Sequence, residues 1–151
     1  MLIRRLSSKD VPSLMRLAHF FWEESAMCSL ADYPEDHIYR TLFNNLSSEG
    51  MIGWGVTDGS KISCAIIFIN SLNIWTQQKQ LCEVAWFNEK DSRFGFSSVK
   101  LIKQAEKWAK ENNYSFITMG RIKGPLSYDK LPLLYHKMGY QNLEETFIKK
   151  I

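Results

Sequence analysis

The stretch "SRFGFSSVKLIKQAEKWAKENNYSFITMG" (residues 92–120) decides the fold, because it joins a glycine-containing turn, a regular helix and a β-rich run. Backbone N–H groups left free at a helix N-terminus form a ready site for a phosphate-bearing ligand, and this turn also carries hydroxyl side chains. Many helices begin in the same way without a ligand. The β-branched and aromatic run at 114–120 predicts a strand after the helix.

The run "LCEVAWFN" (81–88) predicts a strand in front of this stretch. Strand, helix and strand in that order imply a right-handed crossover and a parallel pair. Upstream, "MIGWGVTDG" (51–59) and "KISCAIIFIN" (61–70) are two further strand-like runs joined by Asp58 and Gly59, a strong hairpin signal. The three consecutive strands predict an antiparallel meander.

The outer segments add helices and two more strands. Helical spacing and capping residues predict a helix in each of three runs, "SSKDVPSLMRLAHFFWEES" (7–25), "HIYRTLFNNLSSEG" (37–50) and "DKLPLLYHKMGY" (129–140). Strands are predicted at "LIRRL" (2–6) and at "ETFIKKI" (145–151). The expected order is therefore β α α β β β α β α β.

Length and composition restrict the class of protein. The chain has 151 residues, of which 45% are hydrophobic, which predicts one soluble domain over residues 1–151. A net charge of +3 does not indicate nucleic-acid or membrane binding, and the longest apolar run is too short to span a bilayer. Three cysteines without a CxxC spacing favour buried reduced thiols and a cytoplasmic location.

Three local motifs in this order resemble the Gcn5-related N-acetyltransferase family over nearly the whole chain. They are "CEVAWFN" (82–88), "SRFGFSS" (92–98) and "LYHKMGY" (134–140). The resemblance implies an α/β fold with a single mixed six- to seven-stranded sheet, an antiparallel N-terminal meander, a parallel pair at a splayed centre and about four helices on both faces. Within the family, the chain looks most like the small acetyltransferases often found in bacteriophage genomes, which would place it in the host cytoplasm.

The resemblance also implies acetyl-CoA as the acyl donor, without a metal. In the family, the backbone of the splayed strand holds the pantetheine arm and the following turn holds the pyrophosphate. The corresponding residues are Trp86, Phe87 and Asn88 in the strand, and Arg93, Phe94, Gly95, Phe96, Ser97 and Ser98 in the turn. The family usually has further glycines in this turn. Here Phe94 and Ser97 replace them, and the bulk of Phe94 could narrow the approach of the backbone to a ligand.

Two residues are candidates for the chemistry. Tyr135 matches the family tyrosine that protonates the leaving thiolate, although it could also be one more aromatic packed on the sheet. Glu83 matches a carboxylate that acts as the base, and a carboxylate within an apolar strand would have a raised pKa. Pairing with a lysine or arginine is an equally good interpretation of Glu83.

The acceptor is expected to bind at the loop and helix start "MCSLADYPEDHIY" (27–39), opposite the cofactor. Tyr33, Glu35, Asp36 and His37 are the polar and aromatic groups of this segment. An acidic cluster suits a cationic amine. A solvated loop whose carboxylates cap the helix is the alternative.

The combined prediction is an N-acetyltransferase that moves the acetyl group of acetyl-CoA to a primary amine by direct attack in a ternary complex. The acceptor amine would belong to a protein lysine, a protein N-terminus or a small molecule. One alternative is a non-catalytic binding protein of the same fold, which the changes at Phe94 and Ser97 favour. The other is a toxin-like enzyme that acetylates aminoacyl-tRNA, which would need a more basic face than this charge provides. Dimers are common in the family, so a homodimer is a further expectation.

Overall fold

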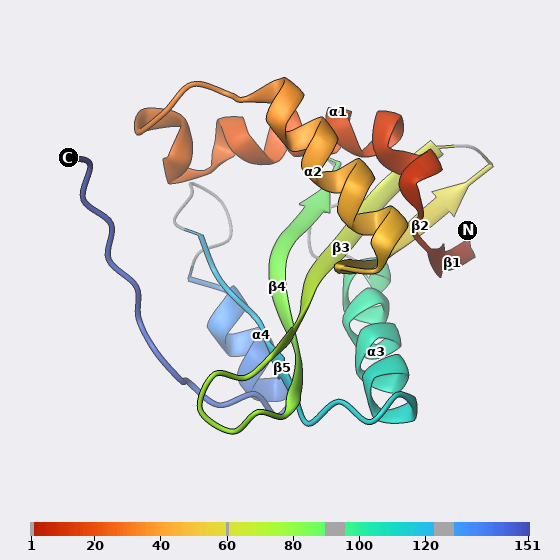
Figure 1. Ribbon diagram of the computed structural model, residues 1–151, viewed down its shortest axis with the longest axis vertical. Helices are drawn as coiled ribbons and strands as arrows, with labels where there is room; N and C mark the ends of the chain where they lie inside the picture. The colour runs from red at the N-terminus through yellow and green to blue at the C-terminus, as the bar shows by residue number, and fades with distance from the viewer. Residues whose placement is uncertain (1, 60, 90–95, 123–128) are drawn as a thin grey trace.

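The computed structural model describes residues 2–59, 61–89, 96–122 and 129–151 (Figure 1). Its helices are α1 (Val11–Glu24), α2 (Glu35–Ser48), α3 (Phe96–Glu111) and α4 (Leu131–Lys137), with short 3-10 turns at Ser8–Asp10 and Ala26–Ser29. Its strands are β1 (Leu2–Arg5), β2 (Met51–Asp58), β3 (Lys61–Leu72), β4 (Lys79–Asn88) and β5 (Phe116–Thr118). The predicted order of elements is confirmed as far as α4.

The strands form one mixed sheet in the order β1-β2-β3-β4-β5. The pairs from β1 to β4 are antiparallel, and β4 pairs with β5 in parallel. The hairpin expected at Asp58 and Gly59 joins β2 to β3, and Gly59 takes a φ of 63°, which glycine adopts without strain. The expected α/β class, with its meander and parallel pair, is thus confirmed.

Helices cover both faces of the sheet (Figure 1). On one face, α1 and α2 pack through a stripe that includes Leu14, Leu17 and Ala18, at the helical spacing seen in the sequence. On the other face, α3 and α4 pack through Leu101, Ile102 and other apolar residues. Each face of the sheet therefore has its own apolar core, and β4 contributes to both.

The sheet has five strands in the described residues, so the expected count of six to seven is wrong. The predicted strand at 145–151 does not form, because residues 140–151 have no regular structure and no strand partner. Phe147 is 89% exposed there. A strand pattern becomes a strand only where another strand supplies its hydrogen bonds, and this segment lies away from the sheet (Figure 1).

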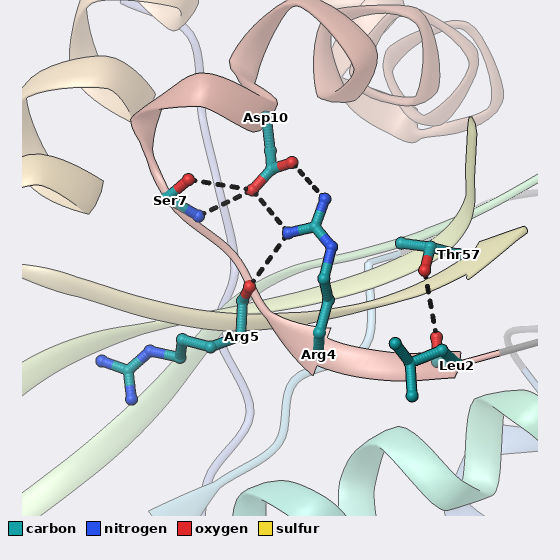
Figure 2. A network of polar contacts seen from close by, with 6 residues as sticks. All are labelled: Leu2, Arg4, Arg5, Ser7, Asp10 and Thr57. Atoms are coloured by element: carbon teal, nitrogen blue, oxygen red, sulfur yellow. Dashed lines mark hydrogen bonds and ion pairs between the residues drawn. The ribbon is translucent and has the colours of Figure 1, made fainter. Parts of the chain in front are cut away.

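A carboxylate ties β1 to the start of α1 (Figure 2). Asp10 accepts hydrogen bonds from both terminal nitrogens of Arg4, at 2.9 and 2.6 Å, and from the backbone N–H of Ser7 at 2.8 Å. The Ser7 hydroxyl adds a fourth bond at 3.2 Å. The hydrogen bonds from Arg4 hold the pKa of Asp10 below its usual range. This network fixes the direction in which the chain leaves β1.

Candidate active site

β4 and β5 run together only briefly and then diverge. The parallel pairs are Gln80 with Phe116, Leu81 with Ile117 and Cys82 with Thr118, and no later residue of β4 pairs with β5. Opposite β3, the register moves from Phe68 with Glu83 to Ile67 with Ala85. Val84 is thus an extra residue in β4, and such a bulge bends a strand and re-aims its side chains. The splayed pair that the family resemblance implied begins here.

Glu83 lies at this bulge. Its Oε2 accepts a hydrogen bond of 2.9 Å from the backbone N–H of Gly120, just beyond β5. Part of the side chain reaches solvent, yet the surrounding protein is dense enough that burial raises the pKa of Glu83 to about 7. No cation pairs with this carboxylate within the described residues, so the ion-pair interpretation of Glu83 is not supported. A carboxylate of this kind can accept a proton near neutral pH.

Tyr135 reaches the same point from α4. Its hydroxyl donates a hydrogen bond of 2.8 Å to the backbone carbonyl of Gly120, and the residue is only 9% exposed. Burial raises the pKa of Tyr135, and the charge of Glu83 raises it further. The hydroxyl therefore keeps its proton when Glu83 is ionised. An ionised Glu83 and a protonated Tyr135 can therefore be present together at Gly120.

Gly120 joins the two candidate catalytic residues, and the sequence reasoning did not identify it. Its N–H holds Glu83 and its carbonyl holds Tyr135. A Cβ added at this glycine would lie 3.2 Å from Oε2 of Glu83, which is closer than most real contacts of such a carbon. The only signal in the sequence was a glycine at the end of the predicted strand at 114–120, which suggests close approach of another group.

The cofactor residues predicted on β4 lie beyond the bulge. Glu89 donates its N–H to the carbonyl of Ser63 at 2.9 Å, so the backbone groups of Glu89 face β3. Because successive residues of a strand face opposite edges, the backbone groups of Trp86 and Asn88 face the side where β5 has diverged. The side chains of Trp86 and Phe87 are buried in the two cores. This arrangement agrees with a backbone role for Trp86 and Asn88, and it orients the backbone of Phe87 toward β3 instead.

The predicted turn is described only at its end. Arg93, Phe94 and Gly95 lie outside the described residues, and so does the side chain of Phe96, the first residue of α3. Ser97 and Ser98 form the rest of the first helical turn. The hydroxyl of Ser98 is fully buried and donates to Asn88 Oδ1 at 2.8 Å. The predicted contact of Ser98 to a phosphate stays a prediction.

The predicted acceptor residues divide into two groups. Tyr33 is half-buried and packs edge-on against the rings of His19 and Trp22 of α1, at 4.9 and 5.8 Å. Its hydroxyl oxygen is buried without a hydrogen-bond partner in the described part of the chain, and burial raises the pKa of Tyr33.

Glu35, Asp36 and His37 are exposed in the first turn of α2. No hydrogen bond or ion pair of the described residues joins them to Glu83 or Tyr135. The structure therefore brings together the predicted acid and base, but it shows no contact between them and the predicted acceptor residues.

The described residues show neither a metal-binding cluster nor a membrane-spanning helix. They contain no group of three or more His, Cys, Asp or Glu side chains that could hold a metal ion. They also contain no helix that combines the length and the apolar character needed to cross a membrane.

Comparisons with known proteins place the fold. No protein-family model matches the chain, and no curated protein matches its sequence. Among solved structures, a GCN5-related N-acetyltransferase from Ralstonia eutropha JMP134 matches with a TM-score of 0.76 and 17% identity, covering 99% of this chain and 97% of the other.

Two further solved structures have a similar fold. A ribosomal-protein-alanine N-acetyltransferase from Brucella melitensis biovar Abortus 2308 has a TM-score of 0.73 and 13% identity, with 99% and 98% of the two chains covered. A predicted acetyltransferase from Clostridium acetobutylicum, solved with acetyl-CoA, has a TM-score of 0.72 and 18% identity, with 99% and 95% covered. Nothing in these comparisons supports the likeness to bacteriophage proteins. The chain has the fold of the GCN5-related N-acetyltransferases.

Proposed function

We propose that this protein transfers the acetyl group of acetyl-CoA to a primary amine. The observation that carries the proposal is that Glu83 and Tyr135 bond to the backbone N–H and the backbone carbonyl of the same residue, Gly120, at the place where β4 and β5 diverge. An acid and a base in one site are what acyl transfer from a thioester to an amine requires.

The two residues divide the proton transfers. Glu83, with its pKa raised to about 7, takes a proton from the ammonium form of the acceptor, directly or through water, and leaves a neutral amine. The amine nitrogen attacks the thioester carbonyl carbon, the C–S bond breaks, and the thiolate takes a proton from the Tyr135 hydroxyl. Glu83 releases the first proton to solvent, and the second proton, lost by the attacking nitrogen, restores the Tyr135 hydroxyl. The products are the acetylated amine and free CoA.

The splayed edge of β4 would hold the donor. The outward-facing backbone groups of Trp86 and Asn88 can bond to the amide groups of a pantetheine arm, as a further strand would. The first turn of α3, which contains Ser97 and Ser98, presents the positive end of a helix to the diphosphate. One fold neighbour was solved with acetyl-CoA, which supports this choice of donor.

The acceptor that we propose is a cationic amine. Glu35 and Asp36 are exposed and provide negative charge at the start of α2, with Tyr33 beside them. The same carboxylates also stabilise the positive end of α2, so their position alone does not select an acceptor. The homodimer and the cytoplasmic location stay predictions.

The test is a calorimetric titration followed by an acceptor screen. Acetyl-CoA is expected to bind with micromolar affinity, while ATP, as the control, does not bind comparably. An amine panel of polyamines, lysine peptides and peptide N-termini then identifies the acceptor by release of free CoA thiol. Absence of acetyl-CoA binding would contradict the proposal and would favour the non-catalytic alternative.

A further inference from the structure

The hairpin that joins β3 to β4 carries large apolar side chains that face water. Ile74 and Trp75, at its tip, are 76% and 88% exposed, and Leu72, at the end of β3, is 57% exposed. Single exposed apolar residues are common on protein surfaces, but a group of neighbours that includes a tryptophan marks a contact site. The tip of this hairpin is therefore a candidate interaction surface.

Hydrogen bonds within the loop hold the tip in one shape. The side-chain oxygen of Asn73 accepts bonds from the backbone N–H groups of Trp75 and Thr76, at 3.0 and 3.1 Å. The backbone N–H of Asn73 donates to the carbonyl of Gln78 at 2.8 Å, and its carbonyl accepts from the N–H of Gln77 at 2.8 Å. A loop that is already ordered loses little entropy on binding, so this tip presents Trp75 as a rigid anchor.

An open groove lies next to the base of the same hairpin. It has a volume of about 440 Å³ and is formed by the last turns of α3 and the start of β5, and we call it the α3–β5 groove. Ser115, which lines it, donates its N–H to the carbonyl of Lys79 at the start of β4, at 2.9 Å. The hairpin tip and the segment that joins α3 to β5 lie at the same lower end of the molecule in Figure 1.

The α3–β5 groove has the size and the lining that an indole ring needs. A cavity of roughly 150 Å³ is enough to hold benzene, so a groove of about 440 Å³ has room for an indole. Tyr114 and Phe116 contribute aromatic rings to its lining. Asn113 and Ser115 also line the groove and carry oxygen atoms that can accept a bond from the indole N–H, which usually has a partner when it is buried.

The two surfaces also carry opposite charges. Lys79 is exposed at the base of the hairpin, where its ammonium group lies 5.5 Å from the ring centre of Tyr114 and pairs with no carboxylate in the described part of the chain. Glu106 lines the groove and accepts a hydrogen bond from Tyr140, but no cation of the described residues pairs with it. Complementary charges of this kind favour the association of the tip with the groove.

We propose that two copies of this chain form a dimer in which the hairpin tip of each copy inserts Trp75 into the α3–β5 groove of the other. One chain carries both the projecting tip and the groove at the same end, so a two-fold axis makes the contact twice and closes the assembly. The inference does not depend on the proposed function. The contact lies at the start of β4, and Glu83 and the splayed edge of β4 come later in the strand.

The first test is the mass of the protein in solution, measured by sedimentation equilibrium over a wide range of concentration. The wild type is expected to reach twice the mass of one chain. Trp75→Ala should weaken the dimer about 30-fold or more, as expected for an interface hot spot. Leu2→Ala is the matched control, because it removes a side chain that is 63% exposed on the opposite edge strand, β1, and should leave the dimer unchanged.

The second test shows whether the tip enters the groove. Ser115→Arg places a long side chain in the groove and leaves Trp75 intact, so this variant alone should be as weak a dimer as Trp75→Ala. An equal mixture of the two variants should associate more tightly than either variant alone, because the intact tip of one fits the intact groove of the other. If Ser115→Arg does not fold, Lys110→Trp fills the groove from an exposed position of α3.

The remaining outcomes would each overturn the inference. They are a wild type that stays monomeric, a dimer that Trp75→Ala does not weaken, and a mixture that associates no better than its components. A monomeric wild type that binds anionic lipid vesicles through Trp75 would assign the tip to a membrane surface instead. A monomer that still binds acetyl-CoA would leave the proposed function in place.

Discussion

Two carboxylates of this molecule have opposite environments. Asp10 accepts four hydrogen bonds, two of them from an arginine, and the pKa of Asp10 is lowered (Figure 2). Glu83 accepts one hydrogen bond from Gly120, pairs with no cation within the described residues, and has a pKa raised to about 7. The first environment stabilises charge and joins two elements of the fold. The second environment destabilises the ionised carboxylate, and a carboxylate with a raised pKa is a useful base near neutral pH.

The largest expected effect is on the acid that accompanies Glu83. Tyr135→Phe should lower turnover about 1000-fold, because a positioned general acid is worth about 10²- to 10⁴-fold. The affinity for acetyl-CoA should stay within twofold, since the ring remains. Steady-state kinetics and calorimetry measure the two quantities.

Tyr140→Phe is the matched control for this variant. The Tyr140 hydroxyl donates to Glu106 at 2.8 Å, and its ring lies 5.9 Å from that of Tyr135. The control should keep most of the activity. Full turnover by Tyr135→Phe would remove Tyr135 as the acid.

The next effect concerns the structural carboxylate. Asp10→Asn should lower the free energy of unfolding at pH 7 by about 2 kcal/mol, because hydrogen bonds to a charged group are worth about 1.5 to 3 kcal/mol. Turnover of the folded variant should be unchanged. Urea denaturation measures the loss, and Asp32→Asn, on an exposed loop residue, is the control.

The stabilisation by Asp10 should depend on pH. Since the pKa of Asp10 is lowered on folding, its contribution is present above the pKa of the unfolded chain and is lost as the pH falls through the folded value. The difference between wild type and Asp10→Asn should therefore persist at pH 7 and shrink in acid. A difference that grows in acid would contradict the structural role.

A smaller effect is expected at the glycine between acid and base. Gly120→Ala places a Cβ 3.2 Å from Oε2 of Glu83, so the carboxylate must shift by a few tenths of an ångström. Turnover should fall about tenfold, because small displacements of catalytic groups are costly. Acetyl-CoA affinity and melting temperature serve as internal controls. A fall in melting temperature without a fall in turnover would make the glycine structural only.

The smallest expected effect is on stability at Glu83, where the pH dependence is opposite to that at Asp10. Because the pKa of Glu83 is raised on folding, the folded state binds more protons than the unfolded chain between about pH 4.5 and 7, and stability decreases as the pH rises through that range. Glu83→Gln should therefore be more stable than wild type at pH 8, by about 1 kcal/mol, since partial exposure reduces the full effect. Thermal denaturation at pH 5 and pH 8 measures this difference. Equal stabilities at pH 8 would contradict the claim that the ionised Glu83 carboxylate destabilises the fold.

Local patterns were sufficient to predict most of the fold. Helical spacing located α1 through Leu14, Leu17 and Ala18, and the turn at Asp58 and Gly59 located the hairpin, because these signals depend on neighbours in the sequence. The strand expected at 145–151 failed because a strand depends on a distant partner.

The candidate site was predictable only in part. Glu83 and Tyr135 could be named from motifs, yet their meeting at Gly120 depends on the bulge at Val84 and on the end of β5. The hydrogen bonds of Cys64 and Ser98 to Asn88 join β3, α3 and β4 through cross-strand register, which single-sequence patterns do not encode.

The most direct test of the account is the pH profile of kcat/KM for acetyl transfer by the wild type and by Glu83→Gln. Glu83 must be ionised to act as the base, so the wild-type rate should fall as the pH decreases through about 7, and this inflection should be absent in a variant about 100-fold slower. The same inflection in Glu83→Gln, or a wild-type rate that stays constant down to pH 5, would contradict the assignment of Glu83 as the base.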